Sequence, residues 1–72
     1  MGPMKEFKLE DSEFIPLCDL MKVTDMVESG GEAKHIIGLG EVLVDGIVET
    51  RKRCKIRAGQ EVSFKHHKVK VV

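Results

Sequence analysis

The sequence has 72 residues, enough for one small domain and too few for a second. Its 42% hydrophobic and 33% charged residues are typical of a globular domain and exclude a disordered tail, and no apolar run is long enough to cross a membrane. Twelve basic residues cancel twelve acidic ones, which by itself argues against nucleic-acid binding.

The chain opens with Met-Gly-Pro at residues 1–3, which we interpret as a remnant of cloning, so a single domain is expected over residues 4–72. Apolar and polar residues alternate weakly over residues 5–9, which predicts a short edge strand. The polar residues 11–13 are expected to end this strand. No signal peptide is recognisable, and we therefore expect a cytoplasmic protein.

The next segment predicts a short helix. Pro16 suits the first turn of a helix, because its missing N–H costs nothing there. Leu17, Leu20 and Met21 recur at the spacing of one helical face, which indicates a helix of roughly two turns. Residues 23–27 are expected to connect this helix to the next one.

A second helix is predicted to follow a capping box. The Ser29 hydroxyl can accept the N–H of Glu32, and the Glu32 carboxylate can reach back to the backbone of Ser29. Gly40 is placed to end the helix in a left-handed conformation. We expect three apolar side chains of this helix to face the core and two polar ones to face solvent, namely Ala33, Ile36 and Ile37, and Lys34 and His35.

From residue 41 onward the hydrophobic period changes to two, which indicates strands. Asp45-Gly46, between two apolar runs, is a strong hairpin signal. Residues 50–55 are too basic to be buried and predict an exposed loop, followed by turns at residues 57–60 and 66–67 and by two further strands. The order predicts an α+β domain in which two short helices pack on a small antiparallel sheet.

The zero net charge hides a gradient along the chain. Residues 1–32 contain eight acidic residues against three lysines, a net charge of −5, and residues 33–72 contain nine basic residues against four acidic ones, a net charge of +5. Five of those nine lie within residues 51–57. We expect one positive face centred on residues 51–55, with the acidic residues of the first half turned elsewhere.

No catalytic, metal or cofactor site is predicted. Cys18 with His35, or Cys54 with His66 and His67, could pair a nucleophile with a base, but neither spacing matches a known motif. Adjacent histidines point apart on a strand or turn, which disfavours a metal site. Residues 38–40 lack the further glycine of a phosphate-binding loop. An enzyme with a small-molecule substrate is therefore not expected.

The two cysteines belong to no CxxC pair, and we expect both to remain reduced. Cys18 follows an apolar residue of the first predicted helix and is interpreted as a small core residue. Cys54 lies among basic residues, which predicts a lowered pKa for its thiol.

The basic run is either a solvated loop or an anion-binding surface. Crowded like charges repel one another unless an anionic partner relieves them, which favours nucleic acid. Lys22 and Lys34 are candidates to extend this surface, and the uncovered N–H groups at Gly30 and Gly31 form a secondary candidate phosphate contact. With no Trp or Tyr, and with the three Phe residues assigned to the core, stacking on bases is disfavoured and recognition of RNA shape is favoured.

The pattern resembles the S4-type RNA-binding domain of ribosomal proteins, whose hallmark is the αL motif. The resemblance is carried by Leu17-x-x-Leu20, Ser29, Ala33, Ile36-Ile37, Gly40-x-Val42-x-Val44-Asp45-Gly46 and Gly59-x-x-Val62, and covers roughly residues 16–72. The string from Glu49 to Ile56 is more specific and is similar to a small stand-alone bacterial branch of that family.

The resemblance implies a non-enzymatic module that binds structured RNA, such as a ribosomal subunit or an assembly intermediate. We expect a monomer. The resemblance also implies phosphate contacts at Lys34, Arg51, Lys52, Arg53 and Lys55. Apart from the resemblance, we expect secondary contacts at Lys22, Gly30, Gly31 and Arg57. Two positions depart from the family pattern: Gly30 stands where the family commonly has Arg, and Asp45 replaces the usual Asn. The missing Arg shifts the expected binding toward the basic run.

An alternative is a protein-interaction module of the β-grasp type, either ubiquitin-like or a sulfur carrier. Those folds share the hairpin and the Gly-x-x-Val turn. The carriers also need a C-terminal Gly-Gly, and this chain ends in Lys70-Val71-Val72. A third interpretation is that an acidic protein partner meets the same basic run.

Overall fold

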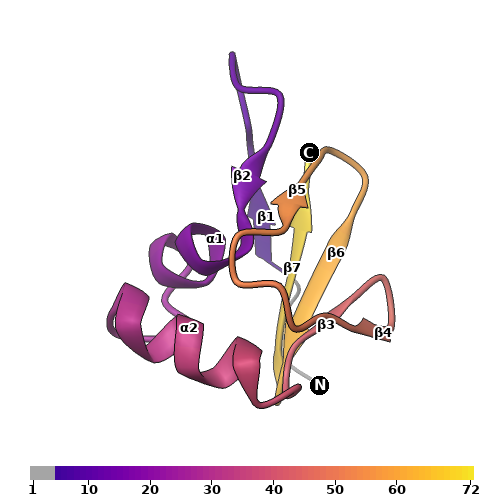
Figure 1. The fold of residues 1–72 in the computed structure, drawn as a ribbon. Helices are drawn as coiled ribbons and strands as arrows, with labels where there is room; N and C mark the ends of the chain where they lie inside the picture. Colours follow the sequence, from indigo (N-terminus) through magenta and orange to yellow (C-terminus); the bar gives the residue numbers. More distant parts are fainter. Residues whose placement is uncertain (1–4) are drawn as a thin grey trace.

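A computed structural model describes residues 5–72, and the three residues interpreted as a cloning remnant lie outside this range. Two helices, α1 (Leu17–Val23) and α2 (Gly30–Gly38), pack on one side of a five-stranded sheet (Figure 1). The predicted α+β class is confirmed. None of the described helices is long and apolar enough to span a bilayer.

The five-stranded sheet has the spatial order β1-β7-β6-β3-β4. Its strands are β1 (Lys5–Phe7), β3 (Leu43–Val44), β4 (Ile47–Val48), β6 (Glu61–Phe64) and β7 (His67–Val71). Neighbouring strands run antiparallel, except that β1 runs parallel to β7. The sheet is thus mostly antiparallel, and the parallel pairing at this edge, which was not predicted, joins the first strand to the last one after a long crossover.

Two further strands escaped the sequence analysis. β2 (Ile15–Pro16) pairs antiparallel with β5 (Lys55–Ile56), with Ile15 opposite Ile56. Each strand has only two residues, too few for an alternating pattern to show. This small ribbon places the end of the basic run beside the start of α1 (Figure 1).

The core lies between the helices and the sheet, and it is built from the predicted apolar faces. The fully buried larger side chains are Leu17, Leu20, Met21, Ile37, Val42, Ile56, Val62, Val69 and Val71. Ile36 is only half-buried against this cluster. Of the three phenylalanines assigned to the core, Phe64 is buried and Phe7 packs against the core, but Phe14 is half-buried outside it.

The predicted cap and hairpin signals form, with one difference. The N–H of Glu32 donates to the Ser29 hydroxyl over 3.2 Å, but Oε1 of Glu32 accepts the N–H of Glu28 over 2.9 Å, one residue earlier than expected. Gly40 ends α2 with φ at +80°. Asp45 and Gly46 both have positive φ, as a tight hairpin turn requires.

The turn between β6 and β7 lies one residue earlier than predicted. Lys65 and His66 form it, and Lys65 adopts a positive φ of 56°. His67 is the first residue of β7 and pairs with Phe64 across the hairpin. The two-residue turn closes the ladder at Phe64 and His67, so only one of the two histidines remains in the turn.

Candidate nucleic-acid interface

The basic loop, defined as residues 51–55, is held in place by the N-terminus of α1. That helix has no side-chain cap, because Pro16 occupies the capping position. Instead, the N–H of Leu17 donates to the carbonyl of Cys54 over 2.9 Å, and the N–H of Cys18 donates to the carbonyl of Lys52 over 3.1 Å. The loop therefore satisfies backbone donors that would otherwise be free, and its backbone is anchored at two points.

One hollow, of about 160 Å³, collects predicted residues from three separate segments. Arg53 of the basic loop, Lys22 of α1 and Lys34 of α2 line it together with Gly30, the first residue of α2. The three side chains carry positive charge, and the helix N-terminus adds a partial positive charge. Tertiary folding has thus placed the secondary candidates Lys22 and Gly30 beside the main ones.

A second hollow is lined by Arg51, Arg53, Cys54 and Lys55. Arg53 therefore lines both hollows and joins them into one basic surface. Lys52 lies over the end of α2, where its Cε would be 3.7 Å from a Cβ added at Gly38. Lys55 holds its ammonium 5.0 Å from the centre of the half-buried Phe14 ring, within the range of a cation–π interaction.

Two predicted residues are not part of this surface. Arg57 lies beyond β5, in the turn that leads to β6, and it lines neither hollow. Gly31 follows Gly30 in α2, but only Gly30 lines the first hollow. Their secondary roles remain predictions.

Glu49 is a partner of the basic loop that the sequence analysis missed. Its Oε1 lies 2.9 Å from Nη2 of Arg51, and its Oε2 accepts both Nε of Arg51 over 3.0 Å and the backbone N–H of Arg51 over 2.9 Å. These hydrogen bonds from Arg51 lower the pKa of Glu49 to about 2 and raise the pKa of Arg51. The basic run contains no acid, but this carboxylate two residues away neutralises its first arginine.

The Glu49 interaction predicts how stability responds to pH. Because the folded state lowers the pKa of Glu49 from 4.5 to about 2, its contribution is present above pH 4.5 and is lost as the pH falls toward 2. In urea unfolding near neutral pH, the native protein should have a slightly higher free energy of unfolding than Glu49→Gln. This gap should close in acid. The gap is small because the Arg51 side chain is exposed, so solvent screens the interaction. A gap that widens with acidification would contradict this prediction.

Cys54 does not have the lowered thiol pKa that its basic neighbours predicted. Its half-buried position raises the pKa of the thiol, and the nearby Glu49 carboxylate raises it further, while Arg51 opposes the rise. Cys18 is buried in the core, as predicted, and neither cysteine forms a disulfide. Over residues 5–72, no three His, Cys, Asp or Glu side chains are placed to hold a metal.

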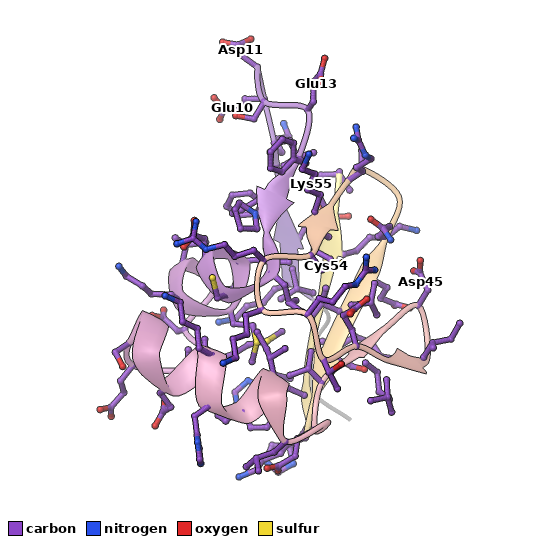
Figure 2. All side chains as sticks on the ribbon, viewed as in Figure 1. Glu10, Asp11, Glu13, Asp45, Cys54 and Lys55 are labelled. Atoms are coloured by element: carbon purple, nitrogen blue, oxygen red, sulfur yellow. The ribbon has the colours of Figure 1, made fainter. Side chains whose placement is uncertain are left out.

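The acidic residues of the first half mostly lie away from the basic loop. Glu10, Asp11 and Glu13 project from the tip of the connection between β1 and β2 (Figure 2). Another acidic group lies at the connection between the helices, around a hollow lined by Asp25, Glu28 and Glu32 together with Lys22, which therefore borders both this hollow and the first basic one. The exception is Asp19, which lines the first basic hollow beside Arg53. Among the described residues, the ion pair on the basic loop is made by Glu49.

Comparison with known proteins identifies a family and two relatives. The family model described as "S4 domain" matches residues 7–72. The candidate RNA-binding protein YbcJ of Escherichia coli (strain K12) is 55% identical over 69 residues, which cover 96% of this chain and 99% of YbcJ. The candidate ribosome maturation protein RlbA of Bacillus subtilis (strain 168) is 35% identical over 54 residues, which cover 75% of this chain and 76% of RlbA.

A solved structure matches the fold as well. The solution structure of YbcJ from E. coli, described as revealing an αL motif involved in RNA-binding, superposes with a TM-score of 0.76 at 54% identity. The match covers all of this chain and 91% of that one. The αL arrangement expected from the sequence is thereby confirmed, and the β-grasp alternative loses its support.

Proposed function

Because the chain belongs to the S4 domain family, we propose that it binds structured RNA through the basic loop and α2. The S4 domain is an RNA-binding domain and not an enzyme. The observation that carries the proposal is the position of Arg53, which joins a hollow shared with Lys22 and Lys34 to one shared with Arg51 and Lys55. Two adjoining cationic hollows suit successive phosphates of a backbone.

The loop supports this function because its geometry is set before RNA arrives. The two hydrogen bonds from the N-terminus of α1 hold the loop backbone, so little backbone conformational entropy is lost when phosphates bind. Arg53 presents a planar fork that matches two phosphate oxygens. Arg51 contributes less than Arg53, since Glu49 already occupies its guanidinium.

We further propose that the RNA is ribosomal, as part of a subunit or of an assembly intermediate. The relative named for ribosome maturation supports this target. A ribosomal partner places the protein in the cytoplasm, where a reducing environment also suits its two free thiols.

The salt dependence of binding tests the proposed function. If about four basic side chains contact phosphates, the slope of log affinity against log salt should be about −3 to −4 with purified ribosomal RNA. In a lysate, we expect the protein to co-sediment with ribosomal subunits and to be released by RNase. Retention after RNase would indicate a protein partner, and a slope near zero would contradict phosphate contacts.

A further inference from the structure

A hollow of about 440 Å³ lies beneath the turn between β6 and β7 and shares no residue with the two hollows of the basic loop. In Figure 1, this turn is at the lower end of the sheet, whereas the basic loop lies higher, beside α1. The wall of the hollow is formed by Met26, Thr24 and Val69, all of them buried. The side chains that complete it are Lys5, His66, His67 and Lys68. None of its described lining residues carries a carboxylate.

Two imidazole rings, those of His66 and His67, line this hollow. The His67 ring lies parallel to the Phe64 ring, at 6.5 Å between centroids and 12° between planes, and the His66 ring lies 5.9 Å from that of His67 and is tilted by 48° to it. The His67 ring is held because Phe64 is buried and pairs with His67 across the hairpin. His66 is exposed and His67 is half-buried, so imidazole remains available to a ligand.

The cationic groups are also placed for a ligand. The ammonium of Lys5 donates to the carbonyl of Thr24 over 3.0 Å, which fixes it at the hollow and leaves its other two protons free of that bond. Lys68 is exposed. The combination of a largely apolar wall, imidazole rings and ammonium groups, with no carboxylate among the lining residues, matches a nucleotide, which has a flat base and a phosphate.

We propose that this hollow binds one unstacked nucleotide of an RNA strand. The base lies against the imidazoles and the apolar wall, and the phosphate lies near Lys5 and Lys68. The inference rests on the proposed function, because the nucleotide would belong to the RNA held by the basic loop. An acidic peptide would satisfy the ammonium groups but would leave the rings and the apolar wall without a matching partner. Histidine rings can stack on bases as well, although only Phe, Tyr and Trp entered the expectation that stacking is disfavoured.

The test is an NMR titration of the full chain with adenosine monophosphate, with inorganic phosphate at equal ionic strength as a parallel arm. The nucleotide should shift amide signals of Met26, His66, His67 and Val69, and phosphate should not reproduce that pattern. His67→Ala should weaken nucleotide binding about fivefold or more, as expected for the loss of a stacking surface. His66→Ala repeats the test at an exposed turn residue, in case the first variant unfolds. Lys70→Ala, exposed on the same strand but not lining the hollow, should bind as the native protein does.

Failure of this inference is distinguishable from failure of the proposed function. If RNA binds through the basic loop while adenosine monophosphate leaves the hollow unshifted, the inference is wrong and the proposed function stands. The inference also fails if inorganic phosphate or a polyglutamate peptide produces the same shifts as the nucleotide. Conversely, Arg53→Ala should weaken RNA binding and leave the nucleotide titration unchanged, because Arg53 does not line this hollow.

Discussion

Alanine at both Arg53 and Lys34 is expected to weaken RNA binding about 30-fold at about 0.15 M salt and to reduce the salt slope by about 2. Each phosphate contact releases about one counterion, so losing one costs about fivefold at that salt concentration. Both side chains line the same hollow, and both are exposed, so the fold should survive their removal. Affinities for purified ribosomal RNA over a series of salt concentrations measure both quantities.

The matched control for this prediction is Lys70→Ala. Lys70 is exposed, and it lies in register with Glu6 on one side and Glu61 on the other, so its charge is partly balanced within the sheet. It lines neither basic hollow. We expect the control to retain the slope of the native protein. If the double variant has the same salt slope as this control, the RNA site does not lie at the basic loop.

The second large effect is expected for stability. Ile56→Ala should reduce the free energy of unfolding by about 2–5 kcal/mol, because it leaves a cavity in a closely packed core. Ile56 is fully buried, and it belongs to the two-stranded ribbon that carries the end of the basic loop. Urea unfolding followed by circular dichroism measures the change. Such a loss is a large part of the total of about 5–15 kcal/mol typical of domains.

Ile47→Ala is the matched control, since it removes the same atoms from a side chain that is 72% exposed. Its effect should be close to zero. If Ile56→Ala unfolds the protein outright, Ile56→Val should still fold and cost about 0.5–1.5 kcal/mol. Equal losses at the two isoleucines would show that the ribbon does not contribute to the core.

The predictions of local structure succeeded where a short stretch of sequence contained the whole cause. The Ser29 cap, the left-handed Gly40 and the hairpin at Asp45 and Gly46 all depend on neighbouring residues, and all three form. The parallel pairing of β1 with β7, and the ribbon of β2 with β5, join segments far apart in the chain. No local pattern specifies such pairs, because their hydrogen bonds depend on which segments folding brings together.

The candidate site shows the same division. Its basic residues were recognisable because five of them lie within residues 51–57. The partners of these residues were not recognisable from the sequence: Glu49 neutralises Arg51, and the ammonium of Lys55 lies over the Phe14 ring. The thiol of Cys54 was expected to have a lowered pKa, but burial and the Glu49 carboxylate raise it. A count of charges along the chain omits distance and solvent exposure, which decide the sign of such effects.

The amino-acid sequence alone determined the kind of protein this is. Its apolar spacing specifies two helices before a hairpin, and its charge gradient puts a concentrated basic segment after them. Only the tertiary structure decided which of those charges form a surface. The N-terminus of α1 binds the loop carbonyls and thereby brings Arg53 beside Lys22 and Lys34, while Arg57 lies in another turn. Electrostatic contacts depend on separation in space, and separation in space is set by the packing of the whole chain.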